Sequence, residues 1–325
     1  MHRPTRLLAM AAALFVLLLG CGTGSALAGT YPEKTIHIVV PFKAGGGTDS
    51  IARALAEAIK AQVDQAVVVD NIDGAGGLTG CIKVAQGAPD GYTLLLTGSS
   101  DLTAALTFTD SPLNLDQFAY IGGVFKSPTW VLSHKDRGYK TLKEFLDAAK
   151  ANPGKLTLGS GTPAGAQMLM SSAIKGISGL DFRIVPYAGG NDLKKALLGN
   201  QVDIGIIHAP VMLGEVQAGL INVIGTGMPL DRIVAENLRN TPTLADAGIP
   251  IEVGITRGVF VAKNTPAPVV ARLTELVKNA AASPAFAEFG KGFGFQPLWI
   301  PGADFEKLVR NEFVLFKDIK KKYIE

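Results

Sequence analysis

A strand, a glycine loop and a helix follow one another near the N-terminus, and this succession constrains the fold more than any other feature. Residues 36–40 form the apolar run Ile-His-Ile-Val-Val, which predicts a buried strand. Gly45–Gly47 come next, and Thr48 or Asp49 can cap the helix that begins there. Backbone N–H groups at such a helix start attract anions. The unit favours an α/β protein that holds a small anion at this loop or, without a ligand, a tight strand–helix turn.

Strand-like and helical segments alternate along almost the whole chain. This is the pattern of an α/β protein with mostly parallel sheets flanked by helices. Apolar runs predict strands over residues 35–40, 66–70, 92–97, 119–125, 129–133, 156–159, 182–185, 204–207, 221–226 and 258–262. The spacing of apolar residues predicts helices near residues 48–61, 78–86, 141–150, 164–176, 190–198, 211–218, 266–280 and 303–323.

Two short extended segments, around residues 128–133 and 255–261, have the character of crossovers between two lobes. The chain is long enough for two domains with cores of their own. Two crossovers would give a discontinuous first domain, residues 29–128 and 256–325, and a continuous second domain, residues 129–255. We therefore expect a ligand cleft at the hinge between the lobes.

The N-terminal segment has the features of an export signal. Two arginines precede an apolar run over residues 7–19 that is short for a membrane span. Cleavage at the small residue Ala28 would remove residues 1–28 as a signal peptide and leave a periplasmic protein. Alternatively, Cys21 ends a segment that resembles a lipobox, and its lipidation would anchor the protein as a lipoprotein.

Charge and cysteine content narrow the class of protein. The formal charge of +3 falls to about +1 once the two arginines of the signal are removed. That balance argues against nucleic acid or an anionic membrane surface as a partner. Separately, we expect a monomer. Only Cys81 remains after cleavage, which excludes a disulfide framework. Cys81 is expected to be either a small buried residue on a helix or a reactive thiol.

Three more turns offer ligand-binding groups at the ends of predicted strands. Residues 71–80 contain a glycine-rich turn around Gly76 that can form a ligand wall or a simple turn. Ser99 and Ser100 follow another strand, where they can also serve as a helix cap. A third strand–loop–helix unit carries Ser160, Gly161 and Thr162. Two helix N-termini facing each other across a cleft would match a molecule with an anionic group at each end, such as a dicarboxylate.

The sequence lacks the usual signatures of catalysis and of metal binding. Neither Ser100 nor Ser160 lies in a G-x-S-x-G nucleophile elbow, and the histidines lack the spacing of metal ligands. Nothing in the spacing of Asp49, Asp101 and Asp203 brings two acids together. We therefore expect a binding protein without cofactor or metal rather than an enzyme.

Several separated motifs in a fixed order give residues 31–325 a resemblance to a known family. The motifs are Tyr31-Pro32, Val40-Pro41-Phe42 with Gly45-Gly46 and Asp49, Gly74-Ala75-Gly76-Gly77, Pro89-Asp90-Gly91-Tyr92-Thr93-Leu94, Pro186-Tyr187, Gly199-Asn200-Gln201-Val202-Asp203, Pro242-Thr243-Leu244-Ala245-Asp246-Ala247-Gly248-Ile249-Pro250, and Pro266 with Pro268-Val269-Val270. Together they resemble the substrate-binding proteins of tripartite tricarboxylate transporters, the Bug or TctC family.

The resemblance implies a two-lobed periplasmic-binding-protein fold of type II. Such a protein closes on a small di- or tricarboxylate and delivers it to the membrane permease subunits of the transporter. A periplasmic sensor that passes its liganded form to a signalling receptor would use the same site. Carried over to this sequence, with the candidates named above, the ligand-binding residues are Lys43, Ala44, Gly45, Gly46, Gly47, Thr48, Asp49, Gly76, Ser99, Ser100, Ser160, Gly161, Thr162, Ala188, Gly189, His208 and Arg257.

The sequence departs from the family pattern at several of these positions. Ala44 stands where the family often has proline, and the family often has an aromatic residue near the position of Arg257. Arg257 can point into the cleft and fork a ligand carboxylate, or point outward as a solvated surface charge. His208 replaces a frequent acidic residue at a strand end and can contact the ligand or lie elsewhere, and Lys43 adds a cation. The changes at Arg257, His208 and Lys43 favour a more anionic ligand.

Overall fold

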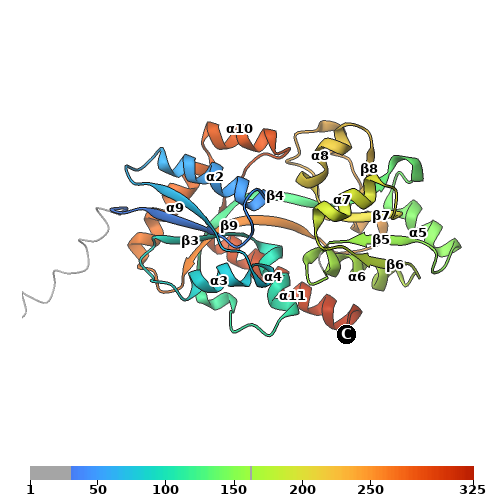
Figure 1. Ribbon diagram of the computed structural model, residues 1–325, viewed down its shortest axis with the longest axis horizontal. Helices are drawn as coiled ribbons and strands as arrows, with labels where there is room; N and C mark the ends of the chain where they lie inside the picture. Colours follow the sequence, from blue (N-terminus) through green and yellow to red (C-terminus); the bar gives the residue numbers. More distant parts are fainter. Residues whose placement is uncertain (1–30, 162) are drawn as a thin grey trace, which may run out of the picture.

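The computed structural model describes residues 31–161 and 163–325 of the chain. The predicted signal peptide, its cleavage after Ala28, the lipobox at Cys21 and the candidate ligand-binding residue Thr162 lie outside these described residues. The described chain forms the predicted α/β fold, in which helices flank a curled mixed sheet (Figure 1).

The sheet has the strand order β2-β1-β3-β9-β4-β7-β5-β6, and β8 and β10 each pair with β4. The strands are β1 (Ile36–Val40), β2 (Val67–Asn71), β3 (Thr93–Gly98), β4 (Phe118–His134), β5 (Thr157–Ser160), β6 (Arg183–Pro186), β7 (Ile204–His208), β8 (Ile221–Thr226), β9 (Gly254–Ala262) and β10 (Ile300–Pro301). The predicted parallel pairing is present at both ends of the sheet, where β1 joins β2 and β3, and β5 joins β6 and β7. At the centre, β4 and β9 run antiparallel to their neighbours.

The long central strand differs from the sequence prediction. Separate strands were predicted at residues 119–125 and 129–133, but β4 continues without interruption from Phe118 to His134. Pro128 does not end the strand because it lies where β4 changes partners, from β9 before it to β7 after it. A residue without an N–H donor is tolerated at such a point in a ladder.

Figure 1 shows two halves of the molecule joined through β4 and β9. β4 pairs with β9 in one half and with β7 and β8 in the other. The predicted crossovers are thus both extended strands. The predicted domain boundaries, between residues 128 and 129 and between 255 and 256, fall inside these two strands, and the limits of the two domains stay a prediction.

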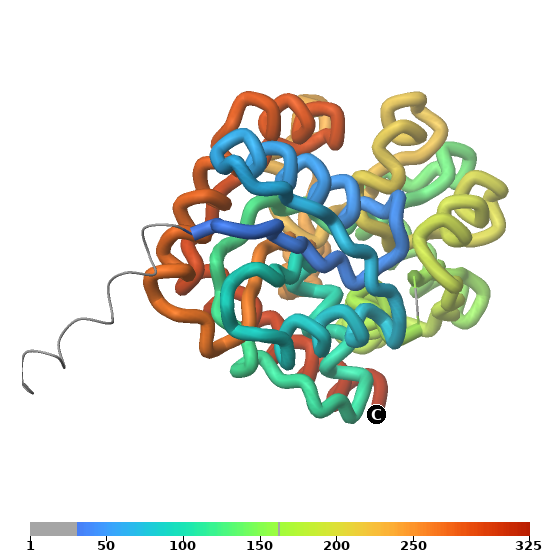
Figure 2. Tube along the Cα trace, turned by 60° about the vertical axis from the view of Figure 1, so that its left-hand side comes forward, coloured from blue at the N-terminus to red at the C-terminus, as the bar shows by residue number. Residues whose placement is uncertain are grey.

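The helices cover both faces of the sheet. They are α2 (Gly47–Lys60), α3 (Leu78–Ala85), α4 (Ser99–Phe108), α5 (Leu142–Ala151), α6 (Ala166–Ser178), α7 (Gly190–Leu198), α8 (Ala209–Gln217), α9 (Ala267–Ala281), α10 (Pro284–Gly292) and α11 (Gly302–Tyr323). Figure 2 shows α2 beside α9 and α10, although these helices are far apart in the sequence. Helix α4 was not predicted, because it is buried on nearly every side and therefore lacks an apolar stripe. Helix α10 was also missed; its start depends on a short Ser283-Pro284 cap signal.

The C-terminal helix α11 packs into both halves. Phe305 and Val309 belong to a core cluster with residues of β3 and β9, whereas Phe316 and Ile319 belong to the core of the second half. The chain therefore passes between the halves along a third element besides β4 and β9.

Cys81 lies buried on α3. Burial raises the pKa of its thiol to about 12, so the thiol stays protonated. Of the two alternatives, the small buried residue is therefore the correct one.

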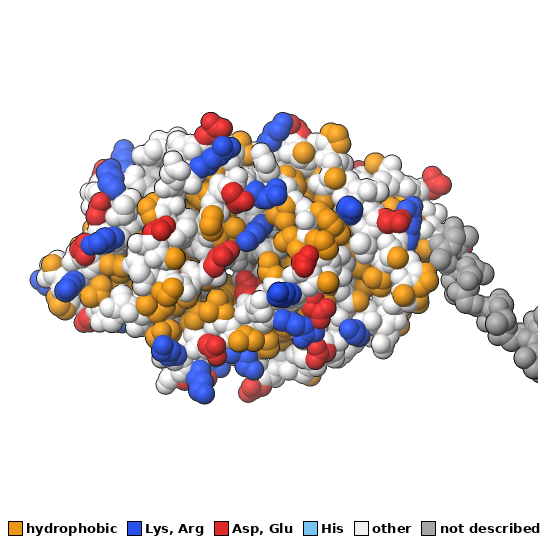
Figure 3. Space-filling model, turned by 180° about the vertical axis from the view of Figure 1, so that it is seen from behind, with side chains coloured by type: hydrophobic (Ala, Val, Ile, Leu, Met, Phe, Trp, Pro, Cys, Tyr) orange, Lys and Arg blue, Asp and Glu red, His pale blue; other side chains and the backbone are white. Residues whose placement is uncertain are grey.

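The surface is of mixed charge. On the face seen in Figure 3, basic and acidic side chains are interspersed among apolar ones. Within the described ranges, no helix combines the length and the apolar character needed to cross a membrane.

Candidate functional site

The register of the central strands brings the ends of two sets of parallel strands to face one another. Gly98, the last residue of β3, pairs with Arg257 of β9, which in turn pairs with Phe125 of β4. His208, the last residue of β7, pairs with Thr129 of β4. Strands β3 and β7 therefore end only four positions apart along β4, or about 13 Å. The carboxyl ends of parallel strands are where α/β proteins place their ligands.

Arg257 is buried between these strand ends, with an exposed fraction of 5%. Its Nε donates to Thr48 Oγ1 at 3.2 Å and its Nη1 to Ser127 Oγ at 3.3 Å. Its Nη2 lies close to Gly47, where an added Cβ would be only 3.6 Å away. The alternative of a solvated surface charge is therefore wrong.

The Arg257 guanidinium has no ion-pair partner among the described carboxylates. Burial lowers the pKa of Arg257. The negative charge of Asp101 opposes that effect, although its carboxylate is not within ion-pair distance of the guanidinium. Burial raises the pKa of Asp101 to about 6, while Arg257 draws it down. A buried cation that has only two hydroxyl partners is costly unless an anion joins it.

The glycine loop ahead of α2 is held by the carboxylate of Asp49. Gly45 N donates to Asp49 Oδ2 at 2.9 Å, Arg53 Nε donates to the same oxygen at 3.0 Å, and Asn71 Nδ2 donates to Oδ1 at 3.0 Å. Although burial opposes them, these hydrogen bonds lower the pKa of Asp49. The carboxylate thus keeps the loop in shape, and the N–H of Gly45 is already engaged. The first turn of α2, which begins at Gly47, lies beside Arg257.

Several buried polar atoms have no hydrogen-bond partner among the described residues. They include Ser100 Oγ in the first turn of α4, Ser160 Oγ at the end of β5, and His208 Nε2 at the end of β7. All three lie at or just after the end of a strand of the facing sets. Unpaired polar atoms in the interior are costly, so their grouping at strand ends indicates a place for a polar ligand or water.

His208 is a neutral side chain in this structure. Its Nδ1 lies 3.3 Å from Thr129 Oγ1. Burial, reinforced by the positive charge of Arg257, lowers the pKa of His208 to about 3. The ring therefore offers a polar nitrogen but no positive charge, contrary to the expectation that His208 makes the site more cationic.

The other predicted site residues are more dispersed. The Lys43 side chain is 87% exposed and lies 3.9 Å from Asp73, which places it outside the buried cluster. Ser99 is buried, and its Oγ accepts the N–H of Thr256 at 3.3 Å. Gly161 is buried and Gly189 precedes α7. Besides Lys43, the exposed members of the predicted set are Ala44, Gly45, Gly46, Gly76 and Ala188.

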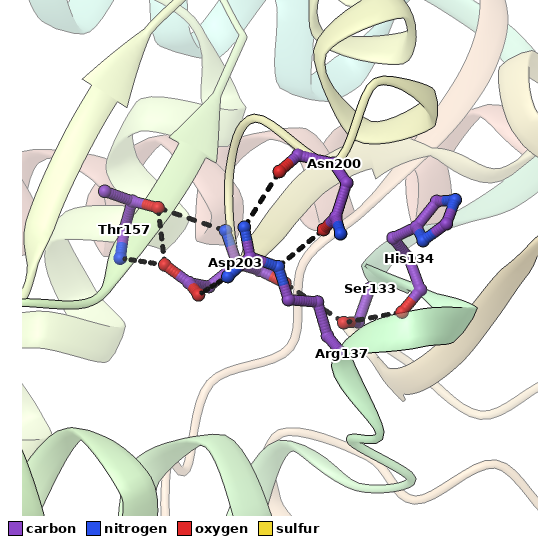
Figure 4. A network of polar contacts seen from close by, with 6 residues as sticks. All are labelled: Ser133, His134, Arg137, Thr157, Asn200 and Asp203. Carbon is purple, nitrogen blue, oxygen red and sulfur yellow. Dashed lines mark hydrogen bonds and ion pairs between the residues drawn. The ribbon is translucent and has the colours of Figure 1, made fainter.

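Asp203, one of the acids considered in the sequence, belongs to a structural network at the opposite end of β7 (Figure 4). Its Oδ2 accepts from the N–H and the hydroxyl of Thr157 at 2.8 and 2.7 Å, and Oδ1 accepts from Arg137 at 2.6 Å. Arg137 also donates to the Asn200 backbone at 2.8 Å. Every oxygen of Asp203 is engaged, so this acid joins β5 to β7 and takes no part in the site.

Comparison with known proteins identifies the family. The sequence profile described as "tripartite tricarboxylate transporter family receptor" matches residues 51–323. The chain belongs to this family. A UPF0065 protein of Bordetella pertussis is 31% identical over 303 residues, which are 92% of this chain and 91% of that protein.

Two solved structures extend the comparison to the receptor's fold. A TctC solute binding protein from Polaromonas superposes with a TM-score of 0.78 at 26% identity, covering 90% of this receptor and 100% of that chain. The periplasmic binding protein BugD gives a TM-score of 0.74 at 30% identity, covering 90% and 98%. Family members are periplasmic solute-binding proteins, so this receptor is a solute-binding protein and not an enzyme.

Sequence reasoning did not assign three polar residues of the receptor's buried cluster to the site. Ser127 and Thr129 contact Arg257 and His208, and Asp101 faces the guanidinium charge. A signal for the first two was present, since two polar side chains two positions apart in an apolar strand point to one face. Asp101 gave no such signal because α4 was not predicted.

Proposed function

We propose that the receptor captures a small organic dicarboxylate or tricarboxylate between its two halves and delivers it to the permease subunits of a tripartite tricarboxylate transporter. The observation that supports this best is the buried Arg257 guanidinium, which has no carboxylate partner among the described residues. A ligand carboxylate would supply the missing negative charge and accept two parallel hydrogen bonds from the guanidinium.

A second anionic group of the ligand is expected at the other half. Ser160 Oγ and His208 Nε2 are buried there without partners in the described part of the chain, and Gly161 follows Ser160. Hydroxyl, imidazole and backbone donors of this kind suit a carboxylate that carries no cation of its own. The ligand would thus join groups from both halves, with Arg257 and Ser100 at one end and Ser160 and His208 at the other.

Capture would work by a population shift. Contacts from both halves would stabilise a closed arrangement of the two predicted domains, residues 29–128 with 256–325 and residues 129–255. The mature receptor would begin at Gly29 and act as a monomer in the periplasm. Retention of the liganded receptor, but not of the unliganded one, by detergent-solubilised permease subunits would support the delivery step.

A thermal-shift screen tests the ligand class. The receptor from Gly29 onward is heated with citrate, succinate, glutamate, aromatic dicarboxylates, a matched monocarboxylate, and succinamide as an uncharged control. A ligand at 100 times its Kd stabilises the folded form by about 2.7 kcal/mol. We expect a saturable rise in Tm with at least one polycarboxylate, a smaller rise with the monocarboxylate and none with succinamide. Equal rises with succinamide, or none with any acid, would contradict the proposal.

A further inference from the structure

Helix α11 passes from one half to the other at Glu312. Phe305 and Val309 pack into one core cluster on one side of this residue, and Phe316 and Ile319 into another on the other side. The Glu312 side chain borders a hollow of about 430 Å³ that is also lined by residues of β4 and β9. Glu312 therefore lies where all three elements that join the halves come together.

The Thr103 hydroxyl lies within hydrogen-bond distance of two oxygens, one of them on the Glu312 carboxyl. Thr103 Oγ1 lies 2.9 Å from the carbonyl oxygen of Ser99, and a carbonyl oxygen only accepts, so the hydroxyl proton points there. The same Oγ1 lies 3.3 Å from Glu312 Oε2. A hydroxyl has one proton to donate. If the shorter contact to the Ser99 carbonyl takes that proton, the contact with Glu312 Oε2 is a full hydrogen bond when the Glu312 carboxyl carries a proton of its own.

Ser99 extends this arrangement to the strand that carries Arg257. Ser99 Oγ accepts the backbone N–H of Thr256 at 3.3 Å and is also a hydrogen-bond partner of the Glu312 carboxyl. The Ser99 hydroxyl can therefore donate to one carboxyl oxygen while the other donates to Thr103. Thr256 immediately precedes Arg257 in β9. Two successive hydrogen bonds, through the Ser99 hydroxyl, thus connect the Glu312 carboxyl to the backbone of β9.

The charged groups around Glu312 agree with a neutral carboxyl. Burial raises the pKa of Glu312 to about 8, and the negative charge of Asp101 on α4 adds to this. The hydroxyls of Ser99 and Thr103, which would also stabilise the ionised form, and the positive charge of Lys126 on β4 oppose it. The remaining charged residues that border the hollow are Glu252 ahead of β9, and Asp304 and Lys307 on α11.

We propose that Glu312 is a positioning residue: a neutral carboxylic acid that fastens α11 and the N-terminus of α4 to β9, and so holds Ser100 and Arg257 in place for ligand capture. Its effect on ligand binding rests on the proposed function. Its protonation and its effect on the unliganded fold do not.

The first test uses the unliganded receptor. Glu312→Gln keeps an N–H donor for Thr103 and a carbonyl acceptor for Ser99, whereas Glu312→Ala removes both. Glu275→Gln removes a charge from α9 at a side chain that is 66% exposed, and serves as the control. Thermal unfolding is recorded from pH 7 to pH 8, above the pKa of about 6 at which Asp101 titrates.

The sign of the pH effect follows from the proton held by the native state. The unfolded chain loses the Glu312 proton near pH 4.5, its ordinary value, while the folded receptor keeps it to about pH 8. Stability therefore falls as the pH rises through this interval. We expect a smaller fall in Tm for Glu312→Gln than for the wild type, and a wild-type fall for Glu275→Gln. Parallel falls in wild type and Glu312→Gln would overturn the proposal.

The second test measures binding of a carboxylate from the thermal-shift panel at pH 7. We expect Glu312→Gln to keep the wild-type Kd within about threefold and Glu312→Ala to weaken binding about tenfold, a loss of about 1.4 kcal/mol. Wild-type affinity in Glu312→Ala would overturn the positioning role. If no acid binds the wild type, the proposed function and the binding part of this inference both fail, and the pH test still decides the protonation of Glu312.

Discussion

Replacing Arg257 by glutamine is the perturbation with the clearest expected consequences. The substitution removes a buried positive charge and keeps a side-chain amide that can reach part of the same hydrogen-bonding space. In the wild type, Arg257 is 5% exposed and bonds only to the hydroxyls of Thr48 and Ser127 among the described residues. The account predicts opposite effects on ligand binding and on the stability of the unliganded fold.

The expected loss of binding follows from the charge pair that a ligand would form. Two unit charges about 4 Å apart, at an effective dielectric constant of about 20, attract one another by about 4 kcal/mol. Loss of this attraction weakens binding about 1000-fold. The unliganded receptor has no such pair to lose within its described residues. Removal of this buried charge, which Asp101 compensates only from a distance, offsets the two hydroxyl hydrogen bonds, each worth about 1.5–3 kcal/mol because the donor is charged. We therefore expect the Tm of the unliganded variant to be at least that of the wild type.

Isothermal titration calorimetry with the best acid of the panel, together with thermal unfolding without ligand, measures both effects. Arg272→Gln is the matched control, because it removes one positive charge from a side chain on α9 that is 38% exposed. Binding by Arg257→Gln within threefold of the wild type would refute the assignment of the guanidinium to the ligand. A clear drop in the Tm of the unliganded variant would refute the argument that the buried charge is costly in the absence of an ion-pair partner.

Three further outcomes follow from the same site. Burial raises the pKa of Asp101 to about 6 while Arg257 draws it down, so the Asp101 carboxylate is charged at pH 8 and neutral at pH 5. The affinity for an acid that is ionised throughout this range should therefore rise as the pH falls, and calorimetry should find a weaker dependence of affinity on pH in Asp101→Asn. Gly46→Val should fold, because the backbone at Gly46 is extended (φ −81°, ψ 168°) and an added Cβ would lie 3.6 Å from the Lys43 carbonyl oxygen. The branched side chain beside the glycine loop should nevertheless abolish the ligand-induced shift in Tm, and full affinity would contradict the loop assignment. Asp49→Asn should destabilise the receptor by about 1–3 kcal/mol in denaturant unfolding at pH 7 and by less at low pH. Folding lowers the pKa of the Asp49 carboxyl, so its contribution to stability is lost as the pH falls; equal destabilisation at both pH values would count against this.

Local sequence patterns predicted most of the elements because their periodicity reflects burial on one face. The apolar run at residues 36–40 and the stripe of α2 after the glycine loop are found where they were expected. The pattern failed where burial is not one-sided. Helix α4 is covered on nearly all sides, and β4 continues through Pro128 because its partners change there.

The chemical state of the site depends on contacts that no local pattern contains. Arg257 meets Thr48 and Ser127 from positions 209 and 130 residues away, so its direction could not be read from its neighbours in sequence. The neutrality of His208 comes from burial and from the charge of Arg257, and both are properties of the folded chain. The glycine loop was recognisable in the sequence, but the engagement of Asp49 with Gly45 turned a candidate ligand contact into a support for the loop.

The most direct test of the central claim is a crystal structure of the receptor with the acid that gives the largest saturable thermal shift. The account predicts a ligand carboxylate within about 3 Å of the Arg257 guanidinium nitrogens. It also predicts a second polar group of the ligand near Ser160 Oγ and His208 Nε2. A ligand bound elsewhere, with Arg257 still bonded only to Thr48 and Ser127, would contradict it.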